Sequence, residues 1–199
     1  MGRSRNHTLL SISTRGLIRT TSRSLDSMGF KQAVNEAMLM LAREGALFVG
    51  QSVAYDGATM YHTLAGVPQE QRLEVPVLED FQLGFCLGLS LVRKAPIVSI
   101  YPRMDFLLLA ANQLVSHLDR FCEMGEFRPK VIVRTRVAPK QPLNAGPQHC
   151  NDYTNAFASM LRNVRVVKLE KAEDVMSTYE RALRSAESSL VVEANGDTS

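Results

Sequence analysis

The sequence lacks the features that mark several classes of protein. Its three cysteines, Cys86, Cys122 and Cys150, form no C-x-x-C pair, so neither a disulfide framework nor a zinc site is indicated, and a reducing compartment is the simpler interpretation. No apolar run approaches the ~20 residues that cross a bilayer, and the most apolar window, residues 81–92, is far shorter. The formal net charge of +3 is too small to indicate a nucleic-acid partner. These absences exclude a membrane-spanning protein and argue against nucleic-acid binding.

What remains is the composition of one compact domain. Only 12 Gly and 8 Pro occur, and 22% of the residues are charged, which argues against a disordered or fibrous chain. With 199 residues, 45% of them hydrophobic, the chain can build a real core, because a domain of this size buries roughly 70% of its unfolded surface. We expect a single domain over residues 28–193, followed by a frayed polar tail over residues 194–199.

The first 27 residues differ from the rest. They contain five arginines and many Ser and Thr, with no acidic residue before Asp26. This composition is compatible with a disordered basic extension, with an organellar transit segment, or with a misassigned start upstream of Met28. We therefore expect a cytoplasmic protein, with the mitochondrial matrix as the alternative if the segment is a transit peptide.

Helical and strand patterns alternate along the body of the chain. Apolar residues recur at helical spacing over residues 30–41, Gly45 follows, and residues 46–50 (ALFVG) resemble a buried strand. The same alternation predicts further strands at 73–77, 97–101, 131–135, 164–169 and 190–193, and further helices at 79–93, 106–121, 153–161 and 172–186. Such alternation requires crossover connections. We therefore predict an α/β fold with a doubly wound, mainly parallel sheet and helices on both faces.

The expected helix over residues 79–93 is unusual. It is apolar on nearly all sides and carries Gly84, Cys86 and Gly88, small residues that permit close approach, so we expect it to be central. It opens with Glu79 and Asp80 directly after an expected strand. Ligands of open α/β sheets bind outside the carboxyl ends of strands, and a helix N-terminus favours carboxylates. The alternative is that these carboxylates only cap the helix.

Five stretches, taken together, resemble a known family. They are FKQAVNEAM (30–38), VGQSVAYDG (49–57), VPVLEDFQLGFCLGL (75–89), DFLLLAANQLV (105–115), and VIVRTRV (131–137) followed by GPQH (146–149). Their order and approximate spacing resemble the pyrimidine-binding (PYR) domain of transketolase-like thiamine-diphosphate enzymes. The resemblance is strongest to the N-terminal domain of the beta subunit of 2-oxo acid (pyruvate) dehydrogenase, and it covers residues 30–193.

The resemblance assigns roles to three residues. Glu79 matches the family glutamate that hydrogen-bonds the pyrimidine ring nitrogen of the cofactor and relays a proton, which requires a carboxyl held away from water. Phe106 matches the aromatic residue that stacks on the aminopyrimidine, with a simple core aromatic as the alternative. His149 matches the histidine that faces substrate and helps transfer to the acceptor, and an exposed loop histidine is the alternative. The adjacent Cys150 is not expected to act as a nucleophile.

The sequence also departs from the family. Residues 138–144 (APKQPLN) replace a glycine-rich stretch near the active-site entrance, and the second α/β domain of the dehydrogenase beta subunit has no counterpart. No G-D-G with a downstream Asn occurs, the family signature that holds Mg²⁺ and the diphosphate. By the resemblance, thiamine diphosphate would be shared with an alpha-like partner that carries the diphosphate-binding (PP) domain and holds Mg²⁺. Pairs of PYR chains, as a homodimer or in a heterotetramer, are also expected.

The expected function is that of a PYR subunit in a split enzyme. Such an enzyme would decarboxylate a 2-oxo acid or cleave a ketose, and would pass the acyl or two-carbon unit to a lipoyl domain, an aldehyde or a sugar. No metal site is expected on this chain. The alternative is a non-catalytic PYR-fold paralogue that acts as a scaffold or regulatory partner.

Overall fold

The structure is a computed structural model, and it describes residues 29–56, 59–138 and 145–194. The expectations for residues 1–27 and for the tail beyond Ala194 lie outside the described residues, as does most of the 138–144 stretch. None of the helices in the described ranges combines the length and the hydropathy that a membrane span requires.

The centre of the fold is a six-stranded sheet in which every neighbouring pair of strands is parallel. The spatial order is β2-β1-β3-β4-β6-β5. The strands are β1 (Leu47–Gly50), β2 (Arg72–Glu74), β3 (Ile97–Tyr101), β4 (Val131–Arg136), β5 (Arg165–Leu169) and β6 (Ser189–Glu193). All residues of the central strands β3 and β4 are buried. The predicted parallel α/β fold is therefore confirmed.

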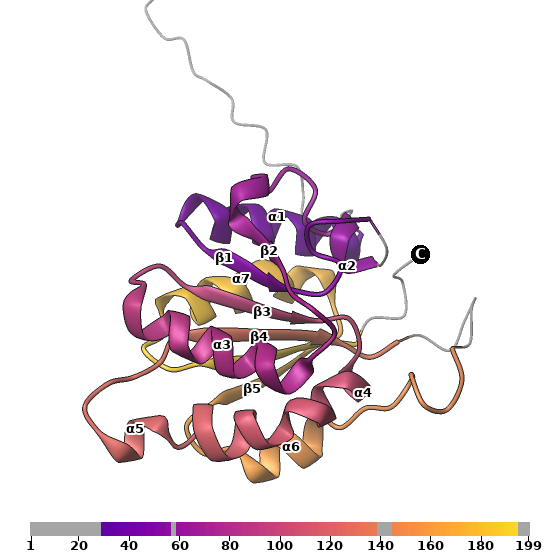
Figure 1. The fold of residues 1–199 in the computed structure, drawn as a ribbon. Helices are drawn as coiled ribbons and strands as arrows, with labels where there is room; N and C mark the ends of the chain where they lie inside the picture. Colours follow the sequence, from indigo (N-terminus) through magenta and orange to yellow (C-terminus); the bar gives the residue numbers. More distant parts are fainter. Residues whose placement is uncertain (1–28, 57–58, 139–144, 195–199) are drawn as a thin grey trace, which may run out of the picture.

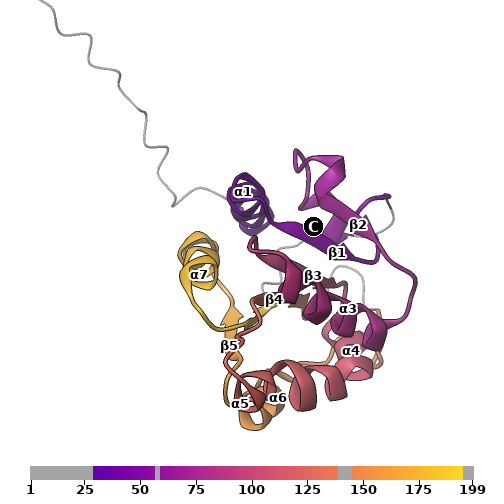
Figure 2. The ribbon, with the colours of Figure 1, turned by 60° about the vertical axis from the view of Figure 1, so that its left-hand side comes forward.

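Helices cover both faces of this sheet, and a separate apolar core lies under each layer (Figure 2). One layer is made by α1 (Phe30–Arg43) and α7 (Ala172–Arg184), together with the segment around α2 (Thr59–His62). The other contains α3 (Glu79–Val92), α4 (Met104–Leu107), α5 (Phe121–Met124) and α6 (Thr154–Met160). The fold is thus doubly wound, as the alternation of elements indicates.

The second strand is shorter than its pattern predicts. Residues 73–77 were expected to be extended, but β2 covers Arg72–Glu74. The Val75 N–H still donates to the Gly50 carbonyl at 3.0 Å. Pro76 then has no N–H to offer, which ends the ladder. Between β1 and β2, the short helix α2 and the 3-10 turn η2 (Gln69–Gln71) lie where the sequence shows no apolar period.

The predicted helix over residues 106–121 begins earlier and is divided. It starts with α4, continues through the 3-10 turn η3 (Leu108–Ala110) and the π-helical turn η4 (Gln113–Leu118), and is followed by α5. At the end of the π-helical turn η4, the Asp119 N–H donates to the Leu114 carbonyl, five residues back, at 3.0 Å. The buried Asp119 Oδ1 then accepts the N–H groups of Arg162, Asn163 and Val164 at 2.7–2.9 Å, which fixes the entry into β5. A tertiary contact therefore accompanies this break in the helical period.

The helix α3 is not central, contrary to the expectation from its composition. Leu83 and Cys86 are fully buried, but Phe81 keeps 51% and Val92 80% of its surface exposed. Phe81, Phe85, Gly88 and Val92 are spaced at i, i+4, i+7 and i+11, so at ~100° per residue they fall on one line along the helix. We call these four residues the outer stripe of α3. The helix α3 is apolar on all sides because one of its apolar faces is not covered by the described chain.

A buried ion pair connects β4, β6 and α7. Arg134 is fully buried, and its Nε and Nη2 donate to the two carboxylate oxygens of Glu193 at 2.7 and 3.0 Å. The Tyr179 hydroxyl donates to Glu193 Oε1 at 2.8 Å. Burial, more than any other cause, raises the pKa of Tyr179 well above its usual value, so this hydroxyl stays protonated. The paired charges can be accommodated in the interior because the contact is bidentate.

We predict that Glu193→Gln lowers the free energy of unfolding by about 3–5 kcal/mol, because it leaves the Arg134 charge buried without a counter-ion. Urea denaturation followed by circular dichroism measures this change. The matched control is Glu187→Gln, which removes a carboxylate from an exposed pair with Arg165 at 3.7 Å and should cost about 1 kcal/mol or less. Equal losses of unfolding free energy in the two variants would show that the buried pair stabilises the fold no more than the exposed pair does.

Candidate functional site

The carboxyl ends of the strands meet at one edge of the sheet, and the helices α3 and α4 begin there (Figure 1). From β1 the chain continues to β2 on one side, whereas β3 lies on the other side of β1 and is followed outward by β4. The direction of winding therefore reverses between β1 and β3. In open α/β sheets this switch point is where ligands bind, so this edge is the candidate site.

Glu79, the first residue of α3, lies at this edge with only 7% of its surface exposed. Gln51, directly after β1, donates from its amide Nε2 to Glu79 Oε1 at 3.4 Å. The Tyr101 hydroxyl at the end of β3 donates to the main-chain oxygen of Glu79 at 2.9 Å. Asp80 is exposed instead, so the two predicted carboxylates differ in environment. No side chain caps α3, which does not support the capping alternative.

The groups beside Glu79 are shielded from water. Burial raises the pKa of the Cys86 thiol to about 12, and it also raises the pKa of Tyr101. The fully buried Gln82, one turn into α3, donates from its amide to Ser99 Oγ at 3.1 Å and to the Ile100 carbonyl at 3.0 Å. The start of α3 is thus fixed to β3 through buried polar contacts, in surroundings of low polarity.

The other two predicted site residues contact one another. The rings of Phe106 in α4 and His149 lie edge to face, with centroids 5.6 Å apart and an interplanar angle of 77°. Nη1 of Arg103 donates to the His149 carbonyl at 3.4 Å. The loop is further held by Asn151, whose Nδ2 donates to Asp105 Oδ1 at 2.6 Å. Among the described residues, the buried His149 Nδ1 has no hydrogen-bond partner.

The structure therefore brings Phe106 and His149 together and places Glu79 on α3, at the same edge of the sheet. The described side-chain partner of Glu79 is Gln51, a residue that the sequence analysis did not single out. Gln51 stands inside the quoted VGQSVAYDG stretch, directly after a strand, and this position was the only signal that could have marked it. The carboxylate, the aromatic face and the imidazole can together contact a flat heterocycle and hold a proton beside it.

The loop that carries Gln51 is fixed by Glu74. Both carboxylate oxygens of Glu74, the last residue of β2, accept backbone N–H groups: Ser52 at 2.6 Å, Val53 at 2.9 Å and Ala54 at 2.8 Å. Ser52 takes a positive φ of 55° to allow this arrangement. Gly50 is also required, since a Cβ there would lie 2.5 Å from the Ile100 carbonyl. Glu74 therefore controls the position of Gln51 without touching it.

Replacing Glu74 by Gln should destabilise the chain by about 1–3 kcal/mol, because an amide offers one acceptor and places an NH₂ group against backbone donors. Chemical denaturation of the full chain measures the loss. Glu70→Gln, an exposed change in η2, is the control and should leave stability unchanged. A denaturation midpoint of Glu74→Gln equal to that of the wild type would show that the three contacts contribute nothing to stability.

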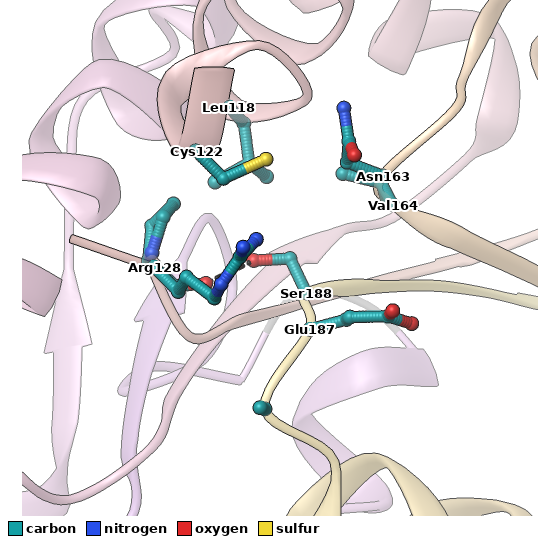
Figure 3. A pocket seen from close by; sticks show the side chains of 9 residues that line it. Leu118, Cys122, Arg128, Asn163, Val164, Glu187 and Ser188 are labelled. Atoms are coloured by element: carbon teal, nitrogen blue, oxygen red, sulfur yellow. Dashed lines mark hydrogen bonds between the residues drawn. The ribbon is translucent and has the colours of Figure 1, made fainter. Parts of the chain in front are cut away.

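A separate pocket lies at the opposite edge of the sheet, where β4, β5 and β6 begin (Figure 3). Leu118, Cys122, Arg128, Asn163 and Ser188 are among the residues that line it. The Ser188 hydroxyl accepts the Val131 N–H at 3.1 Å and donates to the Pro129 carbonyl at 2.8 Å, so this side chain joins two strand entries. The pocket is remote in the fold from Glu79. Among the described residues, no group of three or more His, Cys, Asp or Glu side chains could hold a metal ion.

Comparison of the sequence with protein-family models and with curated proteins gave no match. Comparison of the structure with solved structures did give matches. A split-gene transketolase, described as an inactive beta4 tetramer, has a TM-score of 0.65 and 15% identity, over 83% of this chain and 51% of that one.

Two further solved structures are similar. The thiamine diphosphate-dependent 4-hydroxybenzoylformate decarboxylase of Rhodococcus jostii RHA1 has a TM-score of 0.62 and 18% identity, over 83% of this chain and 30% of that one. A Mycobacterium smegmatis protein that is described as a thiamin diphosphate-dependent enzyme has a TM-score of 0.60 and 15% identity, over 86% of this chain and 31% of that one. The chain thus spans about half of the transketolase chain and about a third of the other two. It has the fold of a domain of thiamine diphosphate-dependent enzymes.

Proposed function

We propose that the chain is the PYR-type subunit of a split, transketolase-like thiamine diphosphate-dependent enzyme. In this proposal it resembles the beta subunit of 2-oxo acid dehydrogenases and acts on a 2-oxo acid or a ketose. The observation that carries the proposal is the buried Glu79 at the switch point of the sheet, bonded to Gln51, at the edge where Phe106 meets His149. The neighbouring structures with this fold are thiamine diphosphate-dependent enzymes by their descriptions, which supports the class.

The residues present fit the aminopyrimidine part of the cofactor. Glu79 offers a carboxyl in a shielded place, suited to sharing a proton with a ring nitrogen, and Phe106 offers an aromatic face. When bound, thiamine diphosphate supplies the carbanion chemistry that breaks the carbon–carbon bond next to a carbonyl. In this proposal His149, whose ring contacts Phe106, exchanges a proton with substrate. Gln51 orients the Glu79 carboxyl through its amide.

Mg²⁺ needs oxygen ligands, and the described residues contain no group of three or more His, Cys, Asp or Glu side chains that could hold a metal ion. We therefore propose that an alpha-like PP-domain subunit holds the diphosphate and Mg²⁺ and completes the site at the carboxyl edge. The split-gene transketolase that shares this fold is described as an inactive beta4 tetramer. By analogy, the present chain is inactive without its partner.

The first experiment is co-purification of the chain from its source, followed by titration of the complex with thiamine diphosphate, with and without Mg²⁺. The proposal expects a partner with G-D-G and a downstream Asn, and Mg²⁺-dependent binding that the isolated chain lacks. A complex that ignores the cofactor would contradict it and would favour the scaffold alternative.

We predict that Glu79→Gln lowers turnover of this complex by two or more orders of magnitude while folding and subunit association are kept, because only the proton relay is removed. Exchange of the cofactor's acidic proton, measured by NMR, should slow in parallel. Asp80→Asn changes the neighbouring exposed carboxylate and should leave both rates as in the wild type. Unchanged turnover in Glu79→Gln would remove Glu79 from the mechanism.

The outer stripe of α3 supports a proposal about assembly: it binds a second copy of this chain. The rings of Phe81 and Phe85 stack with centroids 5.7 Å apart. A Cβ added at Gly88 would have no atom within 4 Å, so there is room for a neighbouring backbone beside this residue. Four uncharged residues in one line suit an isologous contact, in which the same patch serves both subunits. The beta4 assembly of the similar transketolase chain is compatible with self-association of this kind.

If the stripe is this interface, Phe81→Asp should convert a dimer or larger assembly of the chain into a monomer, as measured by sedimentation velocity. The control is Met124→Asp, which puts the same charge on a more exposed apolar residue of α5, away from α3. A wild-type chain that sediments as a monomer at all concentrations, or equal dissociation in both variants, would refute the proposal.

A further inference from the structure

A pocket on the α7 side of the sheet is not used by the site described above. It lies between the second half of α7, the outermost strand β5 and its neighbour β6. Its cavity volume is about 130 Å³, which exceeds the roughly 10–15 Å³ that one water molecule needs. The pocket is therefore large enough for a small ligand.

The two walls of this pocket carry apolar side chains. Val167 of β5 and Val191 of β6 are paired in the sheet, and Val191 is fully buried in the core under α7. Ala182 lines the pocket from the opposite side, on the buried face of α7. Because the alanine side chain is short, the space between the helix and the two valines is left unfilled.

Ser189 brings a hydroxyl to this pocket. It stands two residues before Val191 in β6 and hence on the same face of the sheet, and only 2% of its surface is exposed. No hydrogen bond of this hydroxyl occurs among the described residues. Enclosed polar groups in proteins are nearly always hydrogen-bonded, so the partner of Ser189 has to enter the pocket from outside.

The other polar groups of the lining offer donors as well. The hydroxyl oxygen of the buried Thr178 accepts Nη2 of Arg181 at 3.2 Å, so its own proton remains for another acceptor. The Ser185 hydroxyl accepts the Glu187 N–H at 3.0 Å in the same way. None of the described residues that line the pocket has an acidic side chain. The lining thus presents hydroxyl and guanidinium donors without a carboxylate to receive them.

Two guanidinium groups lie at the rim of the pocket. Arg181 forms no ion pair within the described ranges. Arg165 has Glu187 at 3.7 Å, in an exposed and therefore weak pair. The C-terminal end of α7 has a partial negative charge, but Lys130 already donates to one of its last carbonyls, that of Leu183. Positive charge at the rim is therefore available to a ligand.

We infer that this pocket binds a small ligand that has a carboxylate or phosphate group and a short apolar part. The Ser189 hydroxyl and the Arg181 guanidinium donate to the oxyanion, and the apolar part lies against Val167 and Val191. An oxyanion accepts several hydrogen bonds at once, which suits a lining of donors. The inference goes beyond the proposed function, because this pocket contains no residue of the candidate site at the carboxyl edge.

The first test titrates inorganic phosphate, acetate and butyrate into the full chain at constant ionic strength and follows the backbone amides by NMR. We expect saturable shifts in β5, β6 and the second half of α7. The tighter of phosphate and acetate identifies the charged group. Butyrate should bind more tightly than acetate, by up to about fourfold for each methylene that the valines bury. Shifts that do not saturate, or butyrate that binds no more tightly than acetate, would overturn the inference.

The second test removes the charge at the rim. Arg181→Gln should weaken binding of the preferred probe about tenfold or more, because a charge-assisted contact is lost. The matched control is Arg184→Gln, which removes the same charge from the same last turn of α7 but lies outside the pocket, 3.9 Å from Glu180. This control should keep the wild-type affinity. If both variants lose affinity equally, the effect belongs to the charge of the helix end and the site is refuted.

The third test distinguishes a ligand-binding hydroxyl from a structural one. Ser189→Ala should lower the affinity for the preferred probe about threefold to tenfold, and should leave the urea denaturation midpoint of the ligand-free chain unchanged. Ser188→Ala is the control, because the neighbouring hydroxyl bonds the Val131 N–H and the Pro129 carbonyl. It should lower the midpoint and keep the affinity. Wild-type affinity in Ser189→Ala, or a loss of stability as large as in Ser188→Ala, would contradict the proposed role of Ser189.

Discussion

Parallel pairing of all six strands is the constraint on which the rest of this structure depends. Parallel neighbours need crossovers, and every strand ends at the same edge. Because crossovers are right-handed, the reversal of winding between β1 and β3 puts helices on both faces. Polar groups from distant parts of the sequence are thereby brought to one place. The close approach of β1 and β3, which only a glycine at position 50 permits, holds the two strands together where the winding reverses.

The buried polar contacts on the two faces of the sheet have different roles. On the α1 and α7 face, Arg134, Glu193 and Tyr179 form a closed cluster that joins three elements. On the α3 face, Tyr101 and Gln51 bond to Glu79 at the start of α3, and Gln82 of the same helix donates to the Ile100 carbonyl of β3. These contacts leave the Glu79 carboxyl at the carboxyl edge of the sheet. The first arrangement stabilises the fold, whereas the second places a group where a ligand can reach it.

Much of the fold follows from local patterns, because strong apolar periods fix α1, α7 and the central strands to within a few residues. The misses have physical reasons. The segment over residues 104–118 is broken by a π-helical turn whose Asp119 serves a loop more than forty residues away. The outward face of α3 could not be separated from a buried face, because both are apolar.

The candidate site was predictable only in part. Glu79, Phe106 and His149 were named through the family resemblance, and the structure places the last two in ring contact. Gln51 and Glu74 were missed because their roles depend on strand register: Gly50 pairs with Glu74, and no local pattern encodes that pairing.

The Glu74 contact also limits where phosphates can bind. Three consecutive backbone N–H groups that face one acceptor are the kind of concavity that holds phosphate in many nucleotide-binding loops. In this chain the concavity is filled from within, by a carboxylate held at 2.6–2.9 Å. A phosphorylated ligand cannot use the loop after β1 as its anchor unless it first expels a charged side chain of the same sign. The loop after β1 therefore positions Gln51. A phosphate bound at this edge must be neutralised by positively charged groups on another element.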